Sequence, residues 1–294
     1  MKKLVYKKID AFTSHSSTGN PAACIYLEAG QILTETEMLE IAKEHKDFVS
    51  EVVYCTPINN DAYILKYYSS ECEVDFCGHG TIACIYDLLK CNKNSRSLSE
   101  LMIDTKKGKL TVYNEIEDLN AVFITAPEPQ YLSQKINVHA ITEALKIMPE
   151  TVSHEHPINL INAGLNTLIV PIISLDEELA IFPDERVLKA FCLKNSIDIV
   201  LTFTRDVFDS TNKVRTRVFA PKFGYLEDKA TGSGNAAMGY YMLKHNMWDG
   251  QPVSIEQNAD KSSFNIVRIK TLKGKVLFGG SATIKIEGRY ILNN

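Results

Sequence analysis

No apolar run in the 294-residue sequence approaches the roughly 18 to 20 residues needed to span a bilayer. The longest near-candidate, residues 168–173, is broken by a proline. The N-terminus also lacks a signal-peptide pattern, because Lys7 and Lys8 interrupt its apolar stretch before a hydrophobic region develops. We therefore expect a cytoplasmic protein without membrane segments.

An excess of positive charge is also missing. Lys and Arg number 32 against 36 Asp and Glu, a net charge of −4, which disfavours nucleic acids and anionic membranes as partners. With 45% hydrophobic and 23% charged residues, the composition is that of a folded globular protein rather than a disordered one. The length allows two domains of about 150 residues each.

The seven cysteines do not form a disulfide framework, since their number is odd, and they suit a reducing compartment. Cys72, Cys77 and His79 invite a zinc interpretation. Their spacing, however, lacks the paired and well-separated ligands of structural zinc sites. The sequence therefore predicts no metal.

Short β-rich runs dominate the chain, and helical patterns are fewer. Thr34, with Glu37 three residues later, predicts a capping box that opens a helix. Weaker helical patterns cover residues 137–147 and 184–193. The predicted strands cover residues 4–12, 23–27, 52–55, 63–68, 112–113, 159–162, 167–172, 199–204, 214–219, 264–272 and 282–286.

The most informative pattern is an internal repeat, in which residues 77–90 align without gaps on residues 231–244. Six positions are identical, and the order of elements before each copy agrees: strand, helix, strand, strand, glycine loop and apolar helix. Chance similarity of two small-residue helices is less consistent with that agreement. We predict two similar halves, each a mostly antiparallel sheet around one apolar helix. Their boundaries are 1–122, completed by 283–294, and 123–282.

Each repeat begins its helix with a Gly-x-Gly turn. The first N–H groups of a helix have no partners within it, and the helix dipole favours negative charge there. Two such ends suit a carboxylate, with phosphate as the competing ligand. Nucleotide binding is disfavoured because both the Walker loop and a strand-linked Gly-x-Gly-x-x-Gly are missing. Tight helix packing is the alternative explanation for the glycines.

Two side chains of the first repeat can carry chemistry. We expect His79, in the first turn of its helix, to stay neutral because the positive dipole end lowers its pKa. Cys77, just before that helix, has surroundings that lower a thiol pKa and suit a base or nucleophile. A small buried hydrophobic role is equally plausible for Cys77.

Two acidic residues complete the candidates. Glu51 begins a strand among apolar neighbours that can raise its pKa towards a value useful for acid–base work, unless it is a surface glutamate at a strand edge. Asp228 stands three residues before the second helix turn, where capping is the common role of an acidic side chain.

With these residues in view, the chain resembles the PhzF-like phenazine-biosynthesis isomerase family, which is related in fold to diaminopimelate epimerase. The matching blocks run nearly from end to end. They are residues 10–13, 19–23, 50–51, 73–83, 217–221, Gly224, 227–233, 256–257, 279–280 and 287–288. The stretches 68–70 and 258–263, Lys229, Gly234 and Asn235 depart from the family pattern, so the substrate does not transfer from a known member.

The resemblance implies two pseudo-symmetric α+β domains, each with a sheet or barrel wrapped around a central helix, and an active site between them. It implies a homodimer that needs no cofactor and moves a proton on a small amino- or hydroxy-substituted carboxylic acid. Glu51 would move the proton, His79 and Asp228 would hold polar groups of the substrate, and a further set would bind it. That set is Asn20, Cys77, Gly78, Gly80, Thr231, Gly232 and Ser233.

Two other functions stay open. Related epimerases use one cysteine before each helix, and this chain has Cys77 but no thiol at the second position, which excludes a two-cysteine mechanism. A racemase using Cys77 and Asp228 as acid and base is the first alternative. A non-catalytic protein of the same fold, binding a small acid or a protein partner, is the second.

Overall fold

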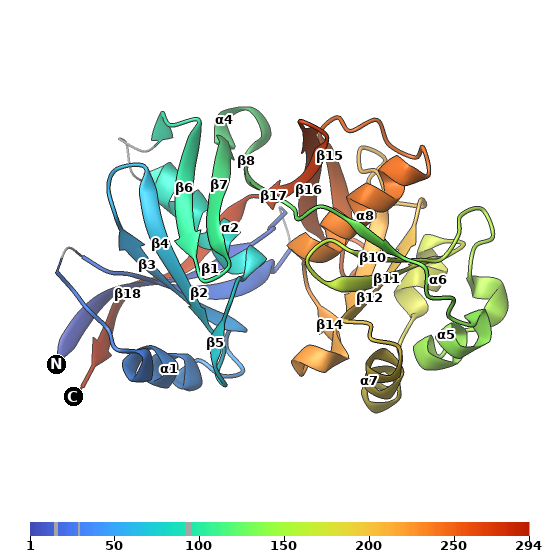
Figure 1. The fold of residues 1–294 in the computed structure, drawn as a ribbon, viewed down its shortest axis with the longest axis horizontal. Coiled ribbons are helices and arrows are strands. Elements are labelled where there is room, and N and C mark those ends of the chain that lie inside the picture. Colours follow the sequence, from blue (N-terminus) through green and yellow to red (C-terminus); the bar gives the residue numbers. More distant parts are fainter. Residues whose placement is uncertain (15–16, 29, 92–95, 294) are drawn as a thin grey trace. The chain divides into compact units, whose positions relative to one another are not determined.

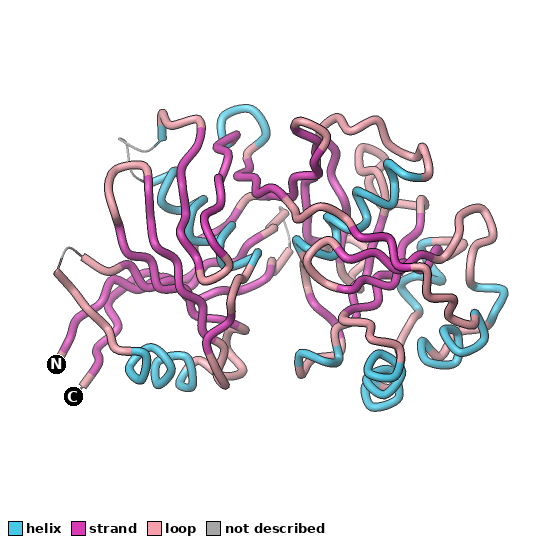
Figure 2. Tube along the Cα trace, viewed as in Figure 1, coloured by secondary structure: helices cyan, strands magenta, loops and turns pink. Residues whose placement is uncertain are grey.

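A computed structural model of the chain describes residues 1–14, 17–28, 30–91 and 96–293. These residues form an α+β protein in which strands outnumber helices (Figure 2). The chain divides into two compact units. Unit 1 comprises Met1–Thr13, Thr18–Thr125 and Gly279–Asn294, and unit 2 comprises Ser14–Ser17 and Ala126–Phe278.

Unit 1 is built from strands around one buried helix (Figure 1). Its strands are β1 (Lys2–Ala11), β2 (Asn20–Tyr26), β3 (Glu51–Pro57), β4 (Ala62–Tyr68), β5 (Glu73–Val74), β6 (Glu100–Thr105), β7 (Gly108–Glu115), β8 (Ala121–Thr125) and β18 (Ala282–Leu292). Its helices are α1 (Glu35–Glu44), α2 (Gly78–Cys91) and α4 (Ile116–Leu119). The C-terminal strand β18 pairs antiparallel with β1 along its whole length.

Unit 2 is also built from strands and helices, and it has one more described α-helix and two 3-10 turns. Its strands are β9 (Gln130–Leu132), β10 (Asn159–Asn162), β11 (Asn166–Pro171), β12 (Ile199–Thr204), β13 (Arg215–Phe219), β14 (Glu227–Asp228), β15 (Val253–Gln257) and β16 (Asn265–Leu272), followed by β17 (Lys275–Gly280). Its helices are α5 (Val138–Leu145), α6 (Leu175–Ala180), α7 (Glu185–Lys194) and α8 (Gly232–Lys244), with 3-10 turns η1 (Pro149–Thr151) and η2 (Pro221–Phe223).

The two units repeat one pairing order. In unit 1, β2 pairs parallel with β3, β3 antiparallel with β4, and β4 antiparallel with β5 and parallel with β6. In unit 2, β11, β12, β13, β14 and β15 make the same five-strand pattern with the same directions. The predicted elements occur in order before each repeat helix, but with additions: a short strand, β5 or β14, precedes the helix, and unit 2 has two helices, α6 and α7, where one was predicted. The strand pairs include parallel ones besides the antiparallel ones.

The repeat helices α2 and α8 are the apolar centres of their units. Most of α2 is buried, and it packs against β1, β2, β3, β8 and β18. Most of α8 is buried as well, against β10, β11 and β16. A helix that is apolar on every side needs strands around it, since a one-sided contact would leave apolar surface in water.

Local sequence signals set the ends of the other helices. The predicted capping box of α1 is confirmed: the Thr34 side chain accepts from the Glu37 N–H, and Glu37 accepts from the Thr34 N–H. Its apolar face, Met38, Ile41 and Ala42, joins the core of unit 1. The patterns at 137–147 and 184–193 became α5 and α7, capped by the side chains of Asn137 and Asp184.

None of the described helices has both the length and the apolar character needed to cross a membrane. No cysteine forms a disulfide in the described part of the chain.

Candidate active site

Glu51 is the first residue of β3, directly after the loop that follows α1. Parallel pairing places it beside Ala22 in β2. Its side chain is only 18% exposed, so it is not the surface glutamate that the sequence left open. The next strand residues, Val52 and Val53, are buried and fix the carboxylate at the strand end.

Cys77 and His79 lie at the start of α2, as the sequence predicted for the first repeat. The Cys77 thiol donates to Glu51 Oε2 at 3.7 Å, and its Sγ lies 3.4 Å from His79 Nδ1. His79 Nε2 lies 3.3 Å from the same Glu51 oxygen. The structure thus brings together Glu51, Cys77 and His79, which come from the start of β3 and the start of α2.

His79 is held neutral. Its ring hydrogen-bonds the backbone of Pro21, and because proline has no N–H, the ring must donate to the carbonyl. Burial lowers the pKa of His79 from 6.5 to about 4, more than the Pro21 bond raises it. The predicted neutrality is confirmed, but the dominant cause is desolvation rather than the helix dipole. The second ring nitrogen then carries a lone pair.

Gly80 fixes the position of the Cys77 thiol. Its backbone N–H donates to Cys77 Sγ at 3.3 Å, so the sulfur is held against the first turn of α2. A Cβ at this position would lie 2.7 Å from Val53 Cγ2 and 3.1 Å from Cys77 Sγ. A side chain here would displace both the strand residue and the thiol, which explains the second glycine of the turn.

Two other candidates of unit 1 lie differently. Asn20 starts β2, is 3% exposed and directly precedes Pro21, the partner of His79. Cys72 is exposed, and its Sγ lies 4.0 Å from Ser69 Oγ. The thiol–imidazole cluster that the sequence considered for a metal is therefore completed by Glu51 and not by Cys72.

The candidates of unit 2 gather before α8. Thr231, the N-cap residue of α8, donates to Asp228 Oδ2 at 2.5 Å and does not cap the helix with its own side chain. Gln257, in β15, accepts from the Thr231 N–H at 2.9 Å and from Asn235 Nδ2 at 2.6 Å, and donates to the Asp228 carbonyl at 2.9 Å. The sequence did not predict that Gln257 and Asn235 hold the Thr231 and Asp228 backbone in place before α8. The match at 256–257 was the only signal of this role.

A fully buried ion pair supports this cluster. Arg215 Nη1 lies 3.1 Å from Glu256 Oε2, and both side chains are inaccessible. Glu256 also accepts from the N–H groups of Phe208 and Asp209, and Arg215 donates to the carbonyls of Asn258 and Asp260. The segment 258–263, which departs from the family pattern, is thereby fastened to the sheet.

The first turns of α2 and α8 share an electrostatic feature. Neither contains an acidic side chain, and the Thr231 side chain does not cap α8. By contrast, α1, α6 and α7 each begin with acidic residues and a side-chain cap. The helix ends that contain Gly78, Gly232 and Ser233 thus leave their positive dipole uncompensated by the chain's own carboxylates in the first turn, as an anion site requires.

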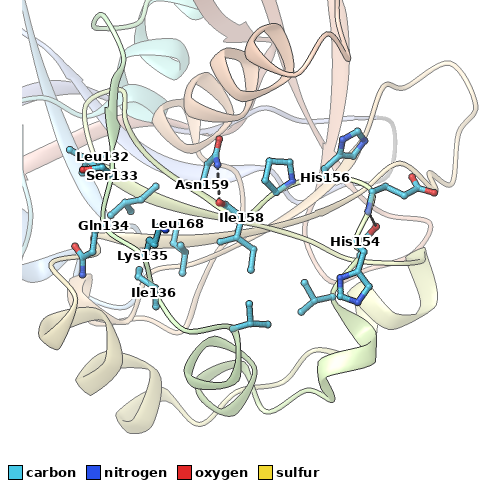
Figure 3. Close-up of a pocket in the computed structure, with 16 residues that line it drawn as sticks. Leu132, Ser133, Gln134, Lys135, Ile136, His154, His156, Ile158, Asn159 and Leu168 are labelled. Carbon is cyan, nitrogen blue, oxygen red and sulfur yellow. Dashed lines mark hydrogen bonds between the residues drawn. The ribbon is translucent and has the colours of Figure 1, made fainter.

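Two grooves are lined by residues outside the cluster at the starts of β3 and α2. The first of them measures about 690 Å³, belongs to unit 2 and is lined around His154, His156 and Asn159 (Figure 3). A second groove of about 510 Å³ shares the stretch 153–156. Neither is lined by a candidate residue from the sequence. These two grooves are therefore distinct from the Glu51, Cys77 and His79 cluster, and the cluster has the more specific geometry.

Comparison with known proteins then places the chain. The model of the PhzC-PhzF family, described as "Phenazine biosynthesis-like protein", matches residues 9–288. The chain belongs to this family. The resemblance drawn from the sequence blocks is confirmed, as is the α+β fold. The crystal structure of a Bacillus anthracis PhzF-family protein covers 99% of the chain and all of its own, with a TM-score of 0.87 at 23% identity.

Two relatives bear on the activity. The "uncharacterized isomerase YfhB" of Bacillus subtilis is 28% identical over 292 residues, covering 98% of this chain and 96% of its own. The trans-2,3-dihydro-3-hydroxyanthranilate isomerase of Pseudomonas fluorescens is 28% identical over 257 residues, covering 87% of this chain and 86% of its own. This PhzF-family protein is an isomerase, as the sequence predicted.

Proposed function

We propose that this PhzF-family isomerase relocates a proton on a small amino- or hydroxy-substituted carboxylic acid, without a cofactor, and that Glu51 is the acid and base. One observation carries the proposal. Glu51 Oε2 lies 3.3 Å from His79 Nε2 and 3.7 Å from the Cys77 thiol. A mostly buried carboxylate that accepts from a thiol and lies beside a neutral imidazole is suited to take up and return a proton.

The step conserves atoms and charge. The Glu51 carboxylate removes a proton from a substrate carbon while the C–H electron pair moves into a new π bond and the old double bond shifts. The protonated Glu51 then delivers that proton to another carbon on the same face. A single carrier suffices for such a suprafacial transfer, whereas inversion of a stereocentre needs groups on both faces.

The substrate class has two supports. The Pseudomonas relative is named for a carboxylic acid that bears amino and hydroxyl groups. In this chain, the first turns of α2 and α8 lack acidic residues, which favours anion binding there. We assign substrate carboxylate binding to the turns with Gly78, Gly80, Gly232 and Ser233, and polar-group binding to His79, Asp228, Asn20 and Thr231.

The test is proton exchange. A panel of amino- and hydroxy-substituted carboxylic acids, including trans-2,3-dihydro-3-hydroxyanthranilate, is incubated with the protein in D₂O and followed by NMR. We expect Glu51→Gln to lower the rate of isomerisation and of deuterium incorporation by about 10² to 10⁴ while substrate binding persists.

The matched control is Glu73→Gln, because Glu73 is a similarly half-buried glutamate of unit 1, with a side chain 24% exposed. It should keep full activity. Survival of activity in Glu51→Gln, with its loss in Cys77→Ala or Asp228→Asn, would transfer the role to the Cys77/Asp228 racemase mechanism. Ligand-induced stabilisation without any proton exchange would instead make the protein a binder.

The family resemblance also leads us to propose a homodimer. Sedimentation equilibrium should give the mass of two chains, and a single-chain mass at micromolar concentration would contradict it.

A further inference from the structure

We propose that the trio Glu51, Cys77 and His79 is a binding site for a thiophilic divalent cation of the zinc class, and that an ion bound there blocks the isomerase. Carboxylate, thiolate and imidazole are the donor set that zinc takes in proteins. In the described residues, one donor atom from each side chain lies within 4.8 Å of the others.

The donor spacing matches tetrahedral zinc. Bonds of about 2.3 Å to sulfur and about 2.0 to 2.2 Å to nitrogen and oxygen place the ligand atoms of a tetrahedral ion about 3.3 to 3.6 Å apart. The measured separations are 3.3 Å from His79 Nε2 to Glu51 Oε2, 3.7 Å from Glu51 Oε2 to Cys77 Sγ, and 3.8 Å from Cys77 Sγ to His79 Nε2. An ion needs only small side-chain shifts to be coordinated by all three.

The surroundings favour this ion. A zinc ion bound to one thiolate and one carboxylate has no net charge. Such a neutral complex costs little to bury, and the side chains of His79 and Glu51 are only 12% and 18% exposed. The Pro21 carbonyl fixes the His79 ring in the way that outer partners of metal-bound histidines do, with one N–H engaged and one lone pair presented.

Coordination conserves protons and leaves an open position. The Cys77 S–H, which donates to Glu51, loses its proton to the buffer as the Zn–S bond forms. Three protein ligands leave the fourth position for water. The bound carboxylate no longer accepts a proton from substrate. The inhibition thus rests on the role proposed for Glu51, whereas the binding does not.

The experiment uses Co²⁺ as a spectroscopic probe and Zn²⁺ as competitor, on the full chain without substrate. We expect tetrahedral visible bands and a sulfur-to-cobalt charge-transfer band, both displaced by Zn²⁺. Cys77→Ser should abolish the charge-transfer band. Glu51→Gln and His79→Gln should each weaken Co²⁺ affinity by at least about tenfold. Loss of a residue that only supports a metal ligand already costs about that much, and loss of a ligand should cost more. Cys72→Ser, which alters the exposed thiol outside the trio, should leave the titration unchanged.

A charge-transfer band that survives in Cys77→Ser, or an octahedral spectrum without it in the wild type, overturns the site. If Cys77→Ser does not fold, equal Co²⁺ affinity in wild type, Glu51→Gln and His79→Gln overturns it as well. The two proposals fail separately. Full isomerase activity in Glu51→Gln would remove the proposed function, and the Co²⁺ site would still stand if the wild-type protein shows the Cys77-dependent charge-transfer band and Glu51→Gln binds Co²⁺ more weakly.

Discussion

His79 shows how burial sets the chemistry of one side chain. The imidazole gives up hydration, and its hydrogen bond to the Pro21 backbone offsets only part of that loss, so its neutral form is favoured and its pKa falls from 6.5 to about 4. A neutral ring beside Glu51 places no fixed cation next to the carboxylate. The charge on His79, next to Glu51, therefore does not change with pH across the neutral range.

This makes the titration of His79 a direct prediction. Because its folded pKa lies below the unfolded value, His79 contributes stability that is complete above about pH 6.5 and lost as pH falls towards about 4. In an NMR titration, the His79 ring resonances, assigned by their loss in His79→Gln, should stay constant from pH 8 to 5.5. A midpoint near 6.5 would contradict the structure.

Glu178 is the opposite case, a buried acid. Its side chain is inaccessible, Thr202 donates to one oxygen at 2.8 Å, and the other oxygen has no hydrogen-bond partner among the described residues. Burial raises the pKa of Glu178 from 4.5 to about 8, despite the opposing Thr202 bond and nearby arginines. The carboxyl group is therefore protonated in the folded state at neutral pH.

Because this folded pKa lies above the unfolded one, the stabilisation is complete below about pH 4.5 and is lost as pH rises through about 8. We expect the free energy of unfolding in urea to carry a downward slope of up to about 1.4 kcal/mol per pH unit from Glu178 in this window. Glu178→Gln should remove that slope, and the exposed neighbour Glu177→Gln should keep it. Equal slopes in all three proteins would refute the protonated state.

At the scale of elements, the start of α8 depends on a glycine for packing. A Cβ on Gly232 would lie 2.3 Å from Cε2 of Phe278, a buried side chain that would have to shift to make room. The helix can therefore approach β17 only without a side chain at this position. The same residue opens the turn that we assign to substrate carboxylate binding, so packing and function make the same demand.

Gly232→Ala should lower the free energy of unfolding by roughly 1 to 3 kcal/mol, the usual cost of overpacking. Alanine is otherwise the better helix former, so a loss reports the clash. Gly288→Ala, in β18, is the control, since no atom lies within 4 Å of its added Cβ. It should stay within about 0.5 kcal/mol of wild type in the same urea titration. An unchanged Gly232→Ala would show that the Phe278 ring adapts.

At the scale of the whole molecule, each unit has a core of its own. One hydrophobic cluster of unit 1 contains Leu4, Ile41 and Tyr54, and one of unit 2 contains Leu145, Leu188 and Phe219. Separate cores of this kind are the condition under which parts of a chain open independently.

We therefore expect a mutation in one unit to loosen that unit first. In Gly232→Ala, hydrogen exchange followed by mass spectrometry should rise in peptides from unit 2, such as those of α8 and β12. The peptides of α2 and β3 in unit 1 should keep wild-type protection. A uniform rise across both units would mean that the chain unfolds only as a whole.

The sequence by itself determined the local and repetitive features. The Thr34 capping box, the helix starts at Gly78 and Gly232 and the strand bounds 159–162 and 199–204 follow from short-range patterns of caps, glycines and β-branched residues. The repeat predicted the order of elements, and the matching blocks predicted the family. These signals are readable because neighbouring residues alone produce them.

Only the tertiary structure decided which distant side chains meet. Glu51 and Cys77 are 26 residues apart in sequence, and their side chains meet because α2 packs against both β2 and β3, which pair with each other. Strand β15 escaped prediction because Glu256 and Gln257 are polar residues in a buried strand, and Arg215 and Thr231 satisfy them from elsewhere in the chain. Burial also set the charge of His79. Such contacts join residues that are distant in sequence, and desolvation depends on what packs around a side chain, so neither can be read from a local sequence pattern.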